Sequence, residues 1–484
     1  MGWRTRIALM LVFFLLPGLD AVPADLPDSV DRGDEALAAG QLAEAIEFYR
    51  RAAAYPEGEP AVTFKIAQAQ MAIARQAEGD SSFAYQAARD AWLSALAVDG
   101  ASSIAARGLA ETHLALGESA AAHEWAIAAA DMPAGSSFWH QLARAHLENE
   151  EWTLAGQAYG AIASGEPENS EAHYWAGALQ MGTDYPLIQH HLLQARNDLL
   201  YRERVDKLLL ALDELTGTTD LAFRAARLGL AYLHVGEPAL AQHWLEVALA
   251  EEPTYAEAWA YLGLAQDQLG EDGRRAIARA IELAPGSPLA HSLMGHHWLR
   301  YDQFGLARQE FIVVRELDPE NPVNMIDVAS TYRMEGDYTL AEAWYQAAIR
   351  QAPGDATLWI QLARFHLDTL NDVADGGLLV AQKAVALAPE NPSALDTLGW
   401  AQFLNGQTRL AETNLLAARE RDPSNSIIHY HLGRLFDSLG ERDKAKAAFQ
   451  EAITMDTICF LCPAPRPGPY AELADRALSE MGGW

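Results

Sequence analysis

A proline recurs at an almost constant interval through the second half of this chain of 484 residues. It ends six successive segments, at Pro253, Pro285, Pro319, Pro353, Pro389 and Pro423. Proline lacks a backbone N–H and disfavours helical geometry in the residue before it, so each position is expected to end a helix. An interval of about 34 residues is typical of chains that stack one small helical unit on the next instead of folding around a single core.

Each segment between prolines divides into two helical stretches. The first carries a large apolar residue, an apolar residue three positions later and a small one four positions later: Trp259/Leu262/Gly263, Trp359/Leu362/Ala363 and Leu395/Leu398/Gly399. The second carries alanine, a large residue four positions later and alanine three positions after that: Ala341/Tyr345/Ala348, Ala411/Leu415/Ala418 and Ala445/Phe449/Ala452. These spacings place each set on one helical face, where the two helices are expected to pack.

The stretch Leu228–Pro253 shows why glycine and proline are tolerated here. In a helix they are about 1 and 3 kcal/mol less favourable than alanine. We expect Gly229 and Ala241 to lie where two helices cross too closely for a larger side chain, and Gly236 to form the turn between them. Packing between neighbouring units then supplies the stability that helix propensity lacks.

This small–aromatic–small–proline pattern with a 34-residue period resembles the tetratricopeptide repeat (TPR) family. The pattern covers nearly all of residues 28–457. The resemblance implies an all-α fold, a right-handed α-solenoid superhelix of about twelve TPR-like helix-turn-helix units. The C-terminal stretch YAELADRALSEM is expected to form the cap helix that such arrays need.

The pattern loses its register between residues 183 and 219 but stays helical in type. We therefore expect a signal peptide at 1–24, an N-terminal TPR array at 25–182 and an irregular helical insert or joint at 183–219. A C-terminal TPR array is expected at 220–457, and a tail with a CxxC motif and the cap helix at 458–484.

The N-terminus has the pattern of an export signal. Arg4 and Arg6 precede an apolar run from Ile7 to Leu16, and Ala24 fits the small-residue rule for cleavage before the next residue. The run is short for a bilayer span. We therefore expect a periplasmic or extracellular protein, with retention of the N-terminus as a membrane anchor as the alternative.

The chain carries 35 Lys and Arg against 66 Asp and Glu, which gives a formal net charge of −31. A surface this acidic repels phosphate backbones, so a nucleic-acid partner is not expected. The repeats leave little chain for a catalytic domain, and the sequence contains no P-loop, GxSxG or HExxH motif. We expect no enzyme and no cofactor.

Neighbouring histidines and two cysteines are the candidate ligands. His190-His191, His296-His297 and His429-x-His431 lack the i,i+4 spacing of a helical chelate, so we expect no metal. Cys459 and Cys462 are spaced for a disulfide in an oxidising compartment, with two reduced thiols as the alternative.

In the TPR family the first helix of each unit lines a concave groove. Carrying the family's groove positions onto the last five units selects basic and aromatic residues: His296, Arg300, Arg333, Arg364, Trp400, Phe403, Tyr430 and Arg434. Arg, Trp and Tyr dominate binding hot spots, and Arg captures carboxylates in bidentate fashion. The alternative is that Arg364 and Arg434 pair with nearby carboxylates of the chain itself, such as Asp368 and Asp437, and that Phe403 belongs to the core.

The leading hypothesis is an exported scaffold that binds one or more partner proteins through this groove, as an extended peptide or helix, with an acidic one favoured. It places the chain in cell-envelope assembly. Two alternatives remain open: a glycan- or polymer-binding accessory protein that uses the groove aromatics, and a thiol-redox protein that uses Cys459 and Cys462.

Overall fold

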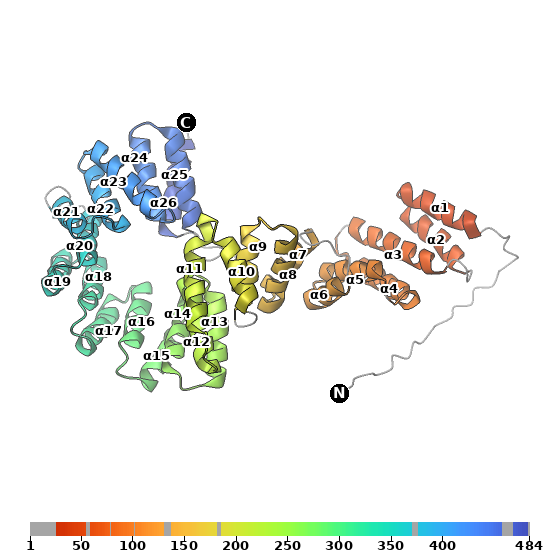
Figure 1. The fold of residues 1–484 in the computed structure, drawn as a ribbon, viewed down its shortest axis with the longest axis horizontal. Helices are drawn as coiled ribbons and strands as arrows, with labels where there is room; N and C mark the ends of the chain where they lie inside the picture. The colour runs from red at the N-terminus through yellow and green to blue at the C-terminus, as the bar shows by residue number, and fades with distance from the viewer. Residues whose placement is uncertain are drawn as a thin grey trace. The chain divides into compact units, whose positions relative to one another are not determined.

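The computed structural model describes residues 26–54, 59–77, 79–100, 102–129, 137–181, 185–369, 376–456 and 468–482. These residues form 26 α-helices and no strand (Figure 1). The prediction of an all-helical repeat fold is therefore confirmed. The expected signal peptide at 1–24 and the Cys459–Cys462 pair lie outside the described residues.

Contacts divide the chain into two compact units, residues 1–146 and 147–484, and the division falls inside α7 (Ser137–Glu148). The helices that precede α7 are α1 (Leu26–Ala38), α2 (Leu42–Ala53), α3 (Glu59–Gln76), α4 (Ser82–Val98), α5 (Ser103–Ala115) and α6 (Ser119–Ala128). This division differs from the expected joint at 183–219, which stays a prediction.

The second unit contains all later helices. Its first part comprises α8 (Trp152–Gly165), α9 (Ser170–Ala178), α10 (Tyr185–Ala195), α11 (Leu199–Glu214), α12 (Leu221–His234), α13 (Pro238–Glu251), α14 (Ala256–Leu269) and α15 (Arg274–Leu283). The remainder comprises α16 (Pro288–Arg300), α17 (Phe304–Leu317), α18 (Val323–Glu335), α19 (Tyr338–Gln351), α20 (Ala356–Thr369), α21 (Leu378–Leu387), α22 (Pro392–Leu404), α23 (Thr408–Arg421), α24 (Ser426–Ser438), α25 (Arg442–Met455) and α26 (Pro469–Gly482).

Within each of the two units, consecutive helices pack in pairs, and each pair packs on the next. The crossing of α12 and α13 shows the role of the small residues. A Cβ built on Gly229 would lie 2.5 Å from Cγ of Leu245 and 3.2 Å from the carbonyl oxygen of Ala241. Gly236 in the turn has a φ of 77°, in the left-handed region that favours glycine. Both expectations for this stretch are confirmed.

The recurring prolines do more than end helices, because their carbonyl oxygens accept side-chain hydrogen bonds from the next repeat. The indole nitrogen of Trp259 donates to the carbonyl of Pro253 at 2.9 Å, and Trp359 donates to Pro353 at 2.9 Å. His429 takes the same place on Pro423, with Nε2 at 2.7 Å. The first helix of one repeat is thereby tied to the end of the preceding repeat.

The segment 183–219 contains a helix outside the pairing scheme. Helix α11 follows α10 and contacts α9, α10 and α12. Its apolar side chains join one large buried cluster with those of α9, α10, α12 and α13. The α11 helix is therefore part of the core of the second unit.

The last helix, α26, packs on α24 and α25. Asp456 Oδ2 accepts the backbone N–H groups of Tyr470 and Ala471 at 2.9 and 2.8 Å, which caps its N-terminus. No helix among the described residues is long and apolar enough to cross a membrane.

Candidate functional site

The eight residues predicted to bind a partner all lie on the first helices of the last five repeats. His296 and Arg300 lie on α16, Arg333 on α18 and Arg364 on α20. Trp400 and Phe403 lie on α22, and Tyr430 and Arg434 on α24. We call this surface, formed by α16, α18, α20, α22 and α24, the first-helix face.

Arginines on this face pair with carboxylates of the following first helix. An Arg333 Nη1 atom lies 3.6 Å from Oδ2 of Asp368 on α20. An Arg364 Nη2 atom lies 4.0 Å from Oδ2 of Asp396 on α22, and its Nε donates to the hydroxyl of Thr397 at 3.4 Å. The sequence-based alternative of internal pairing thus holds for Arg364, but its partner is Asp396.

Asp396 is the buried centre of this arrangement, with 1% of its surface exposed. Its Oδ1 atom lies 2.8 Å from Nδ1 of His431 on α24. The His431 ring stacks on Trp400 with centroids 4.2 Å apart and planes 9° apart, and Trp400 also stacks on Phe403 at 5.1 Å. One carboxylate therefore connects α20, α22 and α24 and fixes the aromatic residues beside it.

The C-terminal end of the face contains a hollow of about 420 Å³ between α24 and α26. Its lining combines three arginines with apolar and acidic side chains: Tyr430, Arg434, Asp437, Arg442, Leu473, Arg476, Ala477, Glu480 and Met481. Arg434 Nη1 donates to the hydroxyl of Tyr430 at 3.0 Å. Within the described residues, no carboxylate lies within ion-pair distance of Arg434, Arg442 or Arg476.

Burial shifts the pKa of two titratable groups at the face, and nearby cations oppose both shifts. Desolvation raises the pKa of Asp368, although its side chain keeps 60% of its surface exposed, and Arg333, Arg364 and His431 oppose the rise. Burial also raises the pKa of Tyr470 on α26, and Arg364 opposes this shift.

Two of the predicted residues lie apart from this cluster. The His296 ring packs edge-on against Phe311 of α17, with centroids 5.1 Å apart. Arg300 is exposed, and within the described part of the chain its side chain shows no ion pair or hydrogen bond. A binding role for the eight residues remains a prediction.

Sequence reasoning missed Asp396, His431 as its partner, and the contribution of α26. Residues Ala394 to Gly399 are all buried, and Asp396 is the one charged residue among them. A buried carboxylate is stable only when an ionic or hydrogen-bonding partner is present. Its partner lies 35 positions away in the chain, which the local pattern does not reveal.

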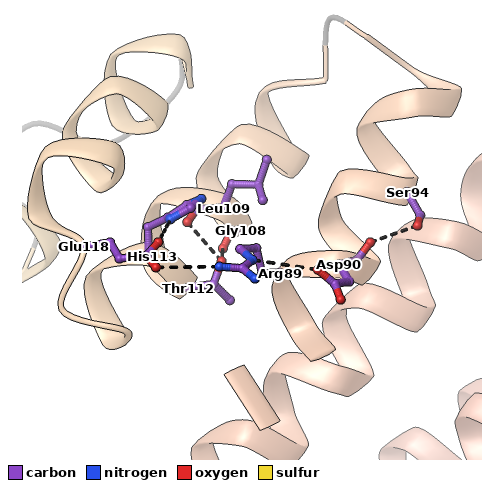
Figure 2. Close-up of polar contacts among 8 residues, drawn as sticks. All are labelled: Arg89, Asp90, Ser94, Gly108, Leu109, Thr112, His113 and Glu118. Atoms are coloured by element: carbon purple, nitrogen blue, oxygen red, sulfur yellow. Dashed lines mark hydrogen bonds and ion pairs between the residues drawn. The ribbon is translucent and has the colours of Figure 1, made fainter. Parts of the chain in front are cut away.

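In the first unit, a polar cluster joins α4, α5 and the start of α6 (Figure 2). Arg89 of α4 lies 3.6 Å from Glu118, which precedes α6 and also contacts His113 of α5. Thr112 donates its hydroxyl hydrogen to the carbonyl of Gly108 at 2.7 Å. The cluster thereby connects Glu118, in the turn between α5 and α6, to α4 of the preceding helix pair.

Several histidines are paired and buried. Nδ1 of His173 lies 2.9 Å from Nδ1 of His191, and burial lowers the pKa of His191 to about 4. Nδ1 of His123 lies 3.0 Å from Nε2 of His146. In the part of the chain that the structure describes, no group of three or more His, Cys, Asp or Glu residues is arranged to hold a metal ion.

Family models of the tetratricopeptide repeat match residues 322–365 and 397–457. The chain therefore contains tetratricopeptide repeats, and these segments include most of the first-helix face. Over 239 residues, which is 47% of this chain, it is 24% identical to "Protein CTR9 homolog" of Arabidopsis thaliana. The chain spans 22% of the length of that relative.

Several solved helical proteins are similar to this chain, each with a TM-score below 0.5. Yeast Tom70 is 15% identical with a TM-score of 0.45, covering 94% of this chain and 96% of the other. Cut9–Hcn1 of APC/C is 15% identical with a TM-score of 0.37, covering 90% and 88%. The pilF protein of Pseudomonas aeruginosa is 18% identical with a TM-score of 0.33, covering 40% and 89%.

Proposed function

We propose that the chain is a non-catalytic scaffold, exported from the cytoplasm, that binds an acidic segment of a partner protein at the C-terminal end of the first-helix face, where α25 and α26 complete the hollow. Stacked helical repeats present more surface than a globular domain of equal length, and proteins of this architecture use that surface for binding. The proposal for export rests on the N-terminal pattern of Arg4, Arg6 and the apolar run from Ile7 to Leu16.

The observation that carries the binding proposal is the hollow between α24 and α26. It gathers Arg434, Arg442 and Arg476 beside apolar side chains, with arginines outnumbering the two acids Asp437 and Glu480, in a chain whose formal net charge is −31. Arginine clusters of this kind favour carboxylates, and neighbouring apolar groups favour a peptide over a small ion. An acidic segment with one or two apolar residues fits this surface best.

The sugar-binding alternative has less support. Sugar rings stack on open aromatic faces, but Trp400 already stacks on His431 and Phe403. Tyr430 is also buried, with 7% of its surface exposed. The groove aromatics therefore act first as packing that holds the arginines in place.

Site-specific crosslinking tests the proposal. A photoreactive residue at Arg434 or Arg476 should capture a partner in cells, whereas one at Arg350 or Arg409, exposed on second helices, should not. The purified partner should then bind Arg434→Ala/Arg476→Ala at least about tenfold more weakly than the unaltered chain. The Arg350→Ala/Arg409→Ala chain is the matched control.

Equal affinity of the Arg434→Ala/Arg476→Ala chain and its control would contradict the assignment of the face. N-terminal sequencing of the protein from cells tests export separately. The mature chain is expected to begin at Asp25, and a chain that begins at Met1 in the cytoplasm would exclude export.

A further inference from the structure

Five of the turns between the two helices of a repeat share one register, which the longer α14–α15 turn does not follow. One residue in each turn has a positive φ: 77° at Gly236, 56° at Asp302, 88° at Gly336, 72° at Gly406 and 75° at Gly440. An acid or amide follows it directly, and four of these five repeats place leucine four positions after it: Leu240, Leu306, Leu340 and Leu410. Equivalent positions can therefore be compared between repeats.

At the α12–α13 turn these positions are covered by α11. Arg204 of α11 donates from Nη1 to Oε1 of Glu237 at 3.0 Å, and Lys207 donates to the carbonyl of His234 at 3.3 Å. Glu237 and Leu240 are each 1% exposed, and Val235 is 3% exposed. Val235 and Leu240 share one buried cluster with the apolar side of α11.

The first unit repeats the ionic part of this arrangement. Gly117 has a φ of 77°, so Glu118 stands at the position of Glu237. Glu118 faces Arg89 of α4 at 3.6 Å (Figure 2). In both places the acid that follows the left-handed residue is met by an arginine from another helix.

The later turns α16–α17 and α18–α19 present the same register, and no helix of the described residues lies over them as α11 lies over the α12–α13 turn. Five apolar side chains there have 40 to 45% of their surface exposed: Tyr301, Leu306, Met334, Tyr338 and Leu340. We call them the turn edge. Asp337, at the position of Glu237, caps α19 through Leu340, and no cationic group of the described residues lies within ion-pair distance of it.

We propose that the turn edge binds an amphipathic α-helix of a partner protein, which lies across it as α11 lies across the α12–α13 turn. The partner helix has an apolar face bordered by Arg or Lys, because α11 contacts the α12–α13 turn through Arg204 and Lys207. Asp337 then receives a cation as Glu237 does, and Asp302, one position earlier in its own turn, offers a second carboxylate. A second copy of this chain is the poorer occupant, since two molecules of formal net charge −31 repel each other.

A peptide that copies the sequence of α11 tests this inference on the full-length chain. The probe is a hydrocarbon-stapled peptide of residues 199–214 with E203Q, D206N, D213N and E214Q, so that its cations are Arg202, Arg204 and Lys207. Stapling reduces the entropic cost of forming a short helix. We expect the peptide to slow amide hydrogen exchange at 299–310 and 332–342 at least about threefold.

Two variants distinguish specific docking from general adhesion. Leu306→Ser/Leu340→Ser should weaken peptide binding at least about tenfold, because both leucines lose their apolar contact. Leu93→Ser/Ile127→Ser, at exposed apolar positions of α4 and α6, should bind as the unaltered chain does. A second peptide that also carries R204E and K207E should bind at least about tenfold more weakly.

Several results would overturn the proposal. These are unchanged exchange at both turns with millimolar peptide, protection confined to 232–242 or to α24–α26, and equal binding of the charge-reversed peptide. A dimer in sedimentation that Leu306→Ser/Leu340→Ser dissociates would also overturn it, because a second copy would then be the occupant.

Discussion

Leu240 and Leu340 stand at the same position of their repeats, yet 1% of the first and 42% of the second is exposed. The same contrast holds for the acids of the two turns, since Glu237 is 1% exposed and Asp337 is exposed. Only the α12–α13 turn has α11 beside it. The comparison shows that the repeat sets the position of a side chain, while a neighbouring helix decides whether that side chain stabilises the core or remains available to a partner.

Removing the arginine from the covered turn should have the largest effect. Arg204→Ala removes the arginine that faces Glu237, whose side chain is 0% exposed. Loss of one member of a buried pair costs about 3 to 5 kcal/mol. We expect amide exchange in α12 and α13 to accelerate by two orders of magnitude or more.

The control for this change lies one turn further along α11. Lys207 is 43% exposed, so Lys207→Ala should change exchange in the same helices by less than threefold. If Arg204→Ala behaved like Lys207→Ala, the ion pair would not hold α11 on the turn.

Truncating the two equivalent leucines should reproduce the contrast in packing. Leu240→Ala creates a cavity in a buried cluster and should lower the free energy of unfolding by about 3 kcal/mol. Leu340→Ala removes an exposed side chain and should change it by no more than about 0.5 kcal/mol. Urea unfolding followed by circular dichroism measures both, and similar losses at the two sites would refute the contrast.

Replacing the turn glycine by alanine should destabilise the protein equally at the covered and the uncovered turn. Gly236 and Gly336 have φ values of 77° and 88°, and this requirement is local to each turn. Alanine in the left-handed region costs about 1 to 2 kcal/mol at either site. Thermal unfolding should therefore report similar destabilisation for Gly236→Ala and Gly336→Ala, and a difference above about 1 kcal/mol would mean that α11 also constrains the backbone of its turn.

The smallest effect is expected where a turn lacks its glycine. Asp302 has a φ of 56° at the glycine position of the α16–α17 turn. Asp302→Gly relieves that strain but also increases the entropy of the unfolded chain, so the net gain should be about 0.5 kcal/mol. Asp302→Ala should instead lower the melting temperature, and a stabilised alanine variant would argue against strain at this residue.

Much of the fold could be predicted because its signals lie within one repeat. The crossing at Gly229 depends on spacings of three and four residues, and the left-handed Gly236 depends on a single turn. The candidate site was predictable only in part. The helix positions of Arg333, Arg364 and Arg434 followed from the repeat, whereas their contacts with Asp368, Asp396 and Tyr430 required the tertiary structure.

Two kinds of residue escaped the sequence reasoning for physical reasons. The Asp396–His431 pair joins residues 35 positions apart, and no local periodicity specifies which acid meets which histidine. Asp302 takes the place of a glycine because Asp tolerates the left-handed region, so a search for turn glycines passes over it.

The sequence by itself determined the repeating helix pair, since short-range spacing of apolar and small residues sets which faces pack. It also determined where the arginines of the first-helix face stand along their helices. Only the tertiary structure decided which equivalent positions are buried, because Leu240 and Leu340 have the same local pattern, yet Leu240 lies in the buried cluster that includes α11 and Leu340 is exposed. Burial depends on contacts between segments distant in the chain, and the repeat pattern does not encode those contacts.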